Sequence, residues 1–393
     1  MAVQKWTLTD VGQSLNIDQW ETEVEMKVEG LPSLKGSIRK YTLRGGRQEG
    51  VEVVEVDNGR CRFAVLCTRG MGVWRAEQNG ITFGWAAPAA TPVHPRHVPL
   101  YDPSGIGWLD GFSEMLVRCG LENNGAPQFC DKGILEYPLH GAIANLPAET
   151  VEVTFDDQTG AITVVGTIRE SRLFFKNLKL QTVYRTSLGG NGFDVDDTVT
   201  NLSAQPGEFQ LLYHVNFGPP LVEPSGEVIL AHETVSPRDA EAARCADNWN
   251  RIDPETPGSS EVCYYFQPSK AAGDGMIRSM LHNADATLGV SLDYRPESLP
   301  CFTLWKSRLD RRDGYVVGLE PGTNYPNTRS YEKQNGRVVQ LTPEASREMN
   351  LSLRFHTNAV EVVEARDVAE SQCDVSPMRL IDQPMSGLSP AGK

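Results

Sequence analysis

The chain has 393 residues, with 37 Lys or Arg against 51 Asp or Glu, so its formal net charge is −14. Because proteins bind nucleic acids by neutralising phosphates with basic side chains, this acidic balance argues against a nucleic-acid partner. No apolar run is long enough to span a bilayer, which argues against a membrane partner as well. The length accommodates one large domain or a few smaller ones.

The amino terminus and the cysteines bear on the compartment in which the protein works. The first residues lead into polar sequence without an apolar segment, so we expect no signal peptide. The 8 cysteines are scattered, without a Cys-x-x-Cys pair or a regular spacing. This pattern is typical of reduced thiols, and it predicts a cytoplasmic protein whose cysteines bind no metal.

Apolar and polar residues alternate with a period of two from about residue 50 onward, and this pattern predicts half-buried strands. In chain order, the predicted strands cover residues 51–56, 151–155, 161–168, 178–186, 193–199, 208–213, 262–266, 288–294 and 349–355. Turn signals at residues 157–160, 189–192 and 335–336 are typical of hairpins between antiparallel neighbours.

Helices contribute little to the predicted fold. Residues 85–107 are rich in Pro, Ala and Gly, which indicates an ordered irregular loop. The best helix candidate, residues 238–249, is short, so a regular alternation of strands and helices is excluded. Many strands, many turns and few helices predict an all-β protein built as a large sandwich or barrel.

Three titratable residues stand at the ends of stretches that otherwise predict buried strand. They are His140 in Leu139-His140-Gly141, His214 in Tyr213-His214-Val215 and Glu320 in Leu319-Glu320-Pro321. A titratable side chain in such a place is costly unless it is paired or faces a cavity. Three such placements predict one polar pocket in a β scaffold, suited to proton transfer.

Each of these residues also has a plainer interpretation. Alone, His140 is typical of a turn histidine bonded to the backbone, and His214 of a satisfied core histidine. Glu320 alone is typical of a strand-end glutamate that faces water. His94 and His97 have a spacing seen in metal sites, but prolines surround them and no third ligand is visible, so we predict a loop and no metal site.

The three elements resemble, in the same order, the motifs of the galactose mutarotase (aldose 1-epimerase) superfamily. That family also carries an arginine about two dozen residues before the first histidine, and Arg118 stands 22 residues before His140. The usual Asn-Arg-Ile is Val117-Arg118-Cys119 here, and the segment before Arg118 is longer than in the common galactose-converting branch. These departures favour a divergent branch of the superfamily.

The resemblance implies the galactose mutarotase-like supersandwich, a large antiparallel β-sandwich. It implies one domain over residues 1–375, and we expect a loosely ordered tail, rich in Pro, Ser and Gly, over residues 376–393. It further implies an isomerase that interconverts the α and β anomers of a free monosaccharide by opening and closing the ring. Neither a metal nor a nucleotide cofactor is required for that reaction.

The resemblance also implies a role for each site residue. Glu320, a carboxylate that is ionised near neutrality, would be the base, and His214 would be the acid. His140 and Arg118 would bind ring hydroxyls and the ring oxygen. Arg69 is a further substrate-binding candidate, because the glycines near it permit close approach of the backbone to a ligand.

Two other functions stay open. A hexose-phosphate epimerase of the same fold would need arginines at the pocket mouth, for which the candidates are Arg308, Arg311, Arg312 and Arg329. A non-catalytic carbohydrate-binding protein would keep the pocket without turnover. The sequence ranks neither the sugars nor the aromatic residues that could carry one, which are Trp108, Trp249, Trp305, Tyr213 and Tyr325, and it leaves monomer or homodimer open.

Overall fold

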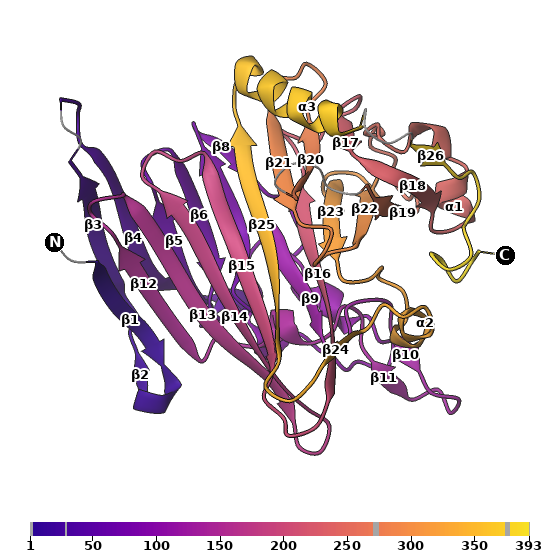
Figure 1. Cartoon of the computed structure of the whole chain (residues 1–393), viewed down its shortest axis with the longest axis horizontal. Helices are drawn as coiled ribbons and strands as arrows, with labels where there is room; N and C mark the ends of the chain where they lie inside the picture. The colour runs from indigo at the N-terminus through magenta and orange to yellow at the C-terminus, as the bar shows by residue number, and fades with distance from the viewer. Residues whose placement is uncertain (1–2, 28–29, 270–274, 374–377, 393) are drawn as a thin grey trace.

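The structure, a computed structural model, describes residues 3–27, 30–269, 275–373 and 378–392. Strands dominate these residues, and nearly all of them pair antiparallel in two large sheets that pack together (Figure 1). The predicted all-β sandwich is therefore confirmed. No helix within these residue ranges is long and apolar enough to cross a membrane.

The first sheet has 10 strands. Its order is β17 (Glu227–Leu230), β20 (Ile277–His282), β21 (Gly289–Tyr294), β25 (Ser346–His356), β15 (Gly192–Asn201), β14 (Lys176–Ser187), β13 (Ala161–Arg172), β12 (Thr150–Phe155), β1 (Gln4–Asp10) and β2 (Leu15–Asn16). Figure 1 shows β12 to β15 and β25 side by side across the front of the molecule.

The second sheet has 14 strands and carries the site described below. Its order is β26 (Arg379–Leu380), β18 (His232–Pro237), β19 (Val262–Pro268), β22 (Cys301–Ser307), β23 (Val316–Gly322), β16 (Gly207–Phe217), β9 (Leu116–Leu121), β7 (Gly72–Gln78), β6 (Cys61–Leu66), β5 (Glu52–Asp57), β4 (Leu34–Thr42) and β3 (Trp20–Met26). Off this path, β24 (Val339–Leu341) pairs with β16 and β8 (Ile81–Phe83) with β7, while β10 (Gln128–Phe129) and β11 (Leu135–Tyr137) form a separate ribbon.

The core lies between the two sheets, because strands of both present apolar side chains inward. Along most of β13 and β15 every second residue is buried. Phe63 from the second sheet meets Phe193 from the first, with ring centroids 4.5 Å apart. Each buried side chain of this size contributes about 1.5–3 kcal/mol by leaving water. Cys61 and Cys67 lie in the same core as free thiols.

Most predicted strands and turns are confirmed. The predicted strands coincide with β5, β12, β13, β14, β15, β16, β19, β21 and β25. Residues 157–160 join β12 to β13, and residues 189–192 join β14 to β15, both antiparallel pairs. The third turn is different, because Asn335 caps α2 (Arg329–Gln334) and Gly336 follows with φ of 72°, the conformation that commonly ends a helix.

The helices differ more from the prediction. Within residues 238–249 the structure forms only α1 (Ala240–Ala243) and a 3₁₀ turn (Ala246–Asn248). A longer helix, α3 (Ala359–Cys373), lies against β17 and β20 and was not predicted (Figure 1). Its buried residues are Val362, Ala365 and Ala369, and a stripe made mostly of alanine gives a weak apolar signal.

The carboxy-terminal residues pack more tightly than expected. The expected boundary at residues 375–376 lies outside the described residues. Beyond it, β26 pairs in parallel with β18, and Leu388 is only 5% exposed. The carbonyl of Leu388 also accepts a hydrogen bond from Asn327 over 2.9 Å. Apart from Leu388 and Ser389, the described residues 378–392 are exposed or half-buried.

Candidate active site

Two neighbouring strands in the second sheet carry the central pair of titratable residues. β16 and β23 are antiparallel, and the register that sets Val215 opposite Leu319 brings His214 opposite Glu320. The two side chains are only 5% and 2% exposed, and His214 Nε2 lies 3.2 Å from Glu320 Oε1. The structure thus brings together two residues that are far apart in the sequence.

Asn216 fixes which nitrogen of His214 carries a proton. Nδ2 of Asn216 donates to the backbone carbonyls of Glu114 and His214, each over 3.0 Å. The Oδ1 atom of Asn216 is therefore an acceptor, and it takes the hydrogen bond from Nδ1–H of His214. With the proton on Nδ1, Nε2 faces Glu320 as an acceptor whenever the imidazole is neutral.

The contact between His214 and Glu320 sets two groups side by side that can exchange one proton. The Nε2 and Oε1 atoms are close enough for this exchange, yet Glu320 Oε1 makes no hydrogen bond with the described residues, so this oxygen is left to bond a ligand. Burial lowers the pKa of His214 to about 3, whereas burial and the charge of Glu261 raise the pKa of Glu320 well above its usual value. Both directions favour the proton on Glu320 in the protein alone, and the pair titrates as a unit.

His140 stands beside this pair, in a tight turn where its φ is 59°. The next residue is restricted to glycine, because a Cβ on Gly141 would lie 2.1 Å from the carbonyl oxygen of Asn123. Nδ1–H of His140 donates to the carbonyl of Asn124 over 2.8 Å, and its ring centroid lies 5.6 Å from that of His214. Burial lowers the pKa of His140 to about 4, so near neutral pH its Nε2 is an acceptor.

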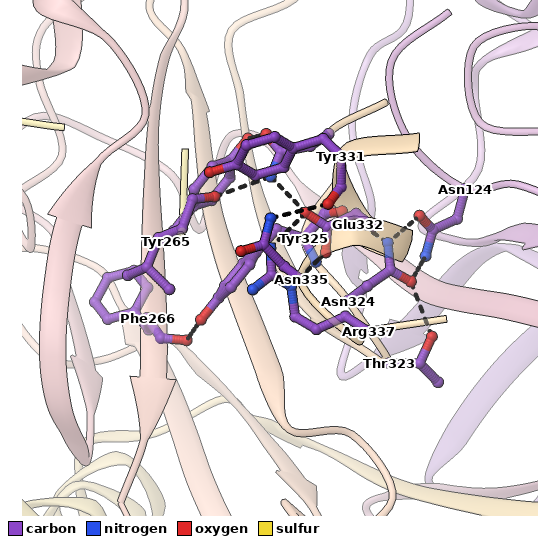
Figure 2. Close-up of polar contacts among 12 residues, drawn as sticks. Asn124, Tyr265, Phe266, Thr323, Asn324, Tyr325, Tyr331, Glu332, Asn335 and Arg337 are labelled. Carbon is purple, nitrogen blue, oxygen red and sulfur yellow. Dashed lines mark hydrogen bonds and ion pairs between the residues drawn. The ribbon is translucent and has the colours of Figure 1, made fainter. Parts of the chain in front are cut away.

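An amide pair and a buried carboxylate hold the wall behind this turn. Figure 2 shows the side chains of Asn124 and Asn324 facing each other, and each Nδ2 donates to the other's Oδ1 over 2.9 and 2.7 Å. The buried carboxylate of Glu332 accepts from the backbone N–H of Tyr325 over 3.3 Å (Figure 2). Because Pro326 follows in the chain and lines the cavity, this network fixes one of its walls.

The titratable residues line a cavity of about 290 Å³ with aromatic walls. Trp108 lies in a 3₁₀ turn (Gly107–Gly111), and its ring centroid is 4.6 Å from that of His140. The rings of Phe112 and Trp305 lie 5.0 and 5.2 Å from that of His214. Of the aromatic residues that the sequence left unranked, Trp108 and Trp305 line the cavity, whereas Trp249, Tyr213 and Tyr325 do not.

The cavity also contains a charged pair that sequence reasoning missed. Arg238 donates to Glu261 over 2.8 Å and also pairs with Asp239. The other carboxylate oxygen of Glu261 accepts from the indole N–H of Trp305 over 2.6 Å. Arg238 directly follows β18 and Glu261 directly precedes β19, so the pairing of these strands brings them together. No local pattern marks them, because charged residues at strand ends are common.

Comparisons with known proteins agree with this geometry. The family model described as Domain of unknown function (DUF4432) matches residues 48–355. The chain belongs to the DUF4432 family. No curated protein matches it.

Solved structures place this DUF4432 protein within a wider superfamily. It is 29% identical to a candidate aldose 1-epimerase from Klebsiella pneumoniae, with a TM-score of 0.92 over 98% of this chain and 100% of that one. A galactose mutarotase-like protein from Clostridium acetobutylicum is 14% identical, with a TM-score of 0.56 over 86% and 99% of the two chains. A galactose 1-epimerase from Lactobacillus acidophilus is 11% identical, with a TM-score of 0.50 over 87% and 100%. The fold is therefore the galactose mutarotase-like supersandwich, in a divergent branch.

The DUF4432 protein does not bring Arg118 to the cavity. The neighbours of Arg118 on β9 are Val117 and Cys119, and both pack with Trp108 on the cavity side. Because successive side chains of a strand point to opposite faces, Arg118 points toward the core between the sheets. There its guanidinium forms a fully buried ion pair with Asp197. The expected sugar contact is corrected accordingly, because a residue next to cavity-facing positions on a strand faces the opposite way.

The prediction that Arg69 binds the sugar is also corrected, because this side chain instead holds the loop that carries Trp108. Its guanidinium is fully buried and pairs with Glu114 over 2.5 Å. It also donates to the carbonyls of Val93 and Gly111 over 2.9 and 3.0 Å, and to the side chain of Asn145 over 2.9 Å. All of its nitrogens are thus engaged by protein, and it does not line the cavity.

The arginines considered for a phosphate site are paired away from the cavity. Their partners are Glu241 for Arg308, Glu255 for Arg311, Asp310 for Arg312 and Glu208 for Arg329. None of the four lines the cavity. His94 accepts the backbone N–H of Arg96 and begins a 3₁₀ turn, and the described residues contain no group of three His, Cys, Asp or Glu that could hold a metal ion.

Proposed function

We propose that this protein is a cofactor-independent aldose 1-epimerase, which interconverts the α and β anomers of a free monosaccharide. The observation that carries the proposal is the contact of 3.2 Å between His214 and Glu320 inside an aromatic cavity. Two groups that share one proton provide one acid and one base, and the opening of a cyclic sugar needs one of each.

The reaction transfers two protons and inverts the anomeric carbon without changing the composition of the sugar. The base removes the proton of the anomeric hydroxyl, the acid protonates the ring oxygen, and the bond between the anomeric carbon and the ring oxygen breaks to give the open aldehyde. After rotation about the bond between the first two carbons, each group reverses its role and the ring closes on the other face. Glu320 acts as the base toward the anomeric hydroxyl, and His214 serves the ring oxygen.

Substrate binding favours the protonation states that this reaction needs, with Glu320 charged and His214 protonated. In the protein alone, the directions of the pKa shifts favour the proton on Glu320. A sugar hydroxyl that donates to the Glu320 carboxylate stabilises its charged form, which favours transfer of the proton to His214. His140 accepts a ring hydroxyl through Nε2, because its Nδ1–H is already donated to Asn124.

The size and lining of the cavity favour a single sugar ring. About 290 Å³ lies just below the usual range for small-molecule pockets, which favours one sugar ring over a longer saccharide. Trp108 and Trp305 offer apolar surfaces for the carbon-bound hydrogens of the ring.

The test is polarimetry or NMR exchange on a panel of freshly dissolved sugars, with and without protein. For at least one sugar we expect faster equilibration of the anomers, reduced by about 10² to 10⁴-fold in Glu320→Gln and in His214→Asn. Glu364→Gln, on the exposed side of α3, is the matched control and keeps the wild-type rate. The proposal fails if no sugar equilibrates faster, or if Glu320→Gln equilibrates the sugars as fast as the wild type does.

Two outcomes would favour the other functions. Tight sugar binding with unchanged equilibration would indicate a carbohydrate-binding protein. A preference for glucose 6-phosphate over glucose that weakens with added salt would indicate a phosphate site, although the arginines considered for it are paired elsewhere.

A further inference from the structure

The hairpin of β13 and β14 extends beyond its neighbours in the first sheet, and its end lines a groove that is separate from the catalytic cavity. β12 supports β13 up to Thr167, which pairs with Thr150. From Ile168 onward β13 pairs with β14 alone, as far as the pairing of Arg172 with Lys176. We call the end of this hairpin the arm. Its base is bonded to neighbouring segments, because Glu170 accepts the backbone N–H of Leu121 over 2.8 Å, whereas its tip is held by β13–β14 contacts.

The tip of the arm exposes three consecutive large apolar side chains. Leu173 is 77% exposed, Phe174 93% and Phe175 70%. Single exposed apolar residues are ordinary on protein surfaces, but contiguous patches of this kind mark interaction sites. The tip therefore requires an explanation that the fold of one chain does not supply.

The backbone conformation of the tip is also unusual for the residues that it contains. A turn over residues 172–175 is closed by the hydrogen bond from the Phe175 N–H to the carbonyl of Arg172, over 3.0 Å. Its third residue, Phe174, has φ of 70°, a conformation that glycine or asparagine normally supplies in such turns. A bulky side chain at a left-handed position costs about 1–2 kcal/mol. Because Phe174 is almost fully exposed, burial of its side chain within its own chain does not offset that cost.

A groove lies beside the tip. It is a cavity of about 620 Å³ lined by the arm, by residues of the 201–208 segment and by Arg329. The tip residues Leu173, Phe174 and Phe175 form part of its wall, and Leu178 and Pro206 add further apolar surface. It shares no lining residue with the catalytic cavity. The tip of the arm and the groove therefore lie next to each other on one face of the molecule.

We propose that two copies of this chain associate through this face, with the arm tip of each copy seated in the groove of the other. An interface with a two-fold axis uses the same patch on both copies, so it requires a patch that is complementary to itself. A projecting apolar tip next to a groove that is partly apolar meets this requirement.

The exposed area is sufficient for a stable dimer. Side chains of this class bury roughly 150–250 Å² each, so the three tip residues leave on the order of 400 Å² to be covered in each copy. With the groove surface that they cover, the two tips bring the interface to roughly 1,200 Å² in total, the lower end of the range for specific interfaces.

The charges around the groove favour a second copy over an anionic membrane. Four basic residues border it, Arg169, Arg172, Lys176 and Arg329, together with the acidic Glu122 and Glu208. Lys176 is held by Glu122 and Glu170, Arg329 by Glu208 and Arg169 by Glu149, so three of the four basic side chains are already paired. A surface of mixed sign suits a symmetric protein partner, whereas an anionic bilayer attracts uncompensated Lys and Arg.

The test is sedimentation equilibrium of the full chain at micromolar concentration. We expect the wild type to be a dimer and Phe174→Ser to dissociate about 100-fold more readily, because each dimer loses two central aromatic contacts. Phe174 is 93% exposed, so its substitution leaves the fold of one chain intact. Leu31→Ser, at a residue that is 69% exposed elsewhere, is the matched control and remains dimeric. A monomeric wild type, or a Phe174→Ser variant that dimerises normally, overturns the proposal.

Hydrogen exchange at two protein concentrations tests the arrangement itself. We expect residues 172–176 and residues 201–208 to become protected together as the concentration rises. Protection of the arm without the groove overturns the proposed seating, and so does a monomer that binds vesicles of phosphatidylcholine and phosphatidylserine through the tip. No sugar enters either experiment, so their outcome is independent of the proposed epimerase activity.

Discussion

Two buried clusters of titratable residues lie on opposite faces of β9 and β16, and they differ in how completely they are hydrogen bonded. Arg118 and Asp197 have no exposed surface, and the guanidinium also donates to Thr182 and Tyr184 over 2.6 and 3.1 Å. His214 and Glu320 are nearly as buried, but they share one contact and border a cavity. Burial alone therefore does not identify a catalytic group, whereas an incompletely bonded pair beside a cavity does.

This difference has an energetic consequence. A saturated ion pair holds its charges at low cost only while both partners remain, so breaking it leaves a buried charge without a partner. The His214–Glu320 pair avoids burying a charge by keeping one proton between two neutral groups. The first cluster should thus respond to substitution in stability, and the second in rate.

The largest effect on stability is expected at the saturated cluster. Asp197→Asn leaves the Arg118 guanidinium buried without a counter-ion and should lower the free energy of unfolding by about 3–5 kcal/mol, measured by urea denaturation. Glu320→Gln makes the same change from carboxyl to amide at the other cluster and should alter stability far less. Equal losses in the two variants would remove the distinction between the clusters.

A smaller effect, on rate, is expected from the residue that orients His214. Asn216→Leu removes the acceptor for Nδ1–H and should slow anomer exchange by about 10- to 100-fold, the equivalent of a lost hydrogen bond of 1–3 kcal/mol. Asn216→Asp keeps an acceptor and adds a charge that favours the protonated imidazole, so it should retain more activity and shift the pH profile upward. An unchanged pH profile in Asn216→Asp would indicate a structural role only.

The smallest effect is expected from a buried histidine outside the cavity, which serves as a reference. Burial lowers the pKa of His232 to about 4, whereas the unfolded chain keeps the ordinary value of about 6.5. Between these values the unfolded state binds more protons, so His232 makes the free energy of unfolding fall by about 1 kcal/mol per pH unit as the pH decreases from 6.5 to 4. His232→Gln should flatten this dependence in urea denaturation at several pH values, and an unchanged slope would show that His232 is not the source.

Much of the fold and the centre of the site could be predicted from the sequence. Alternation with a period of two marks strands such as β13 and β25 because one face of each is buried. His140, His214 and Glu320 could be found because a titratable group at the end of an apolar run is unusual. All three line the same cavity.

The remainder depends on pairings that no local pattern contains. A motif match selected Arg118, but the direction of its side chain depends on the strand pleat, and Val117 and Cys119 take the cavity side. Arg238 and Glu261 meet only because β18 pairs with β19. The apolar stripe of α3 is likewise too weak to predict a buried helix face, and it is buried only because the helix packs on β17 and β20.

The most direct test of the shared proton is a double-mutant cycle on the rate of anomer exchange, with Glu320→Gln, His214→Asn and the double variant measured on one sugar. We expect each single substitution to cost about as much as both together, because an acid without its base cannot open the ring. Losses that add in the double variant would mean that the two residues act independently, and would contradict a catalytic pair.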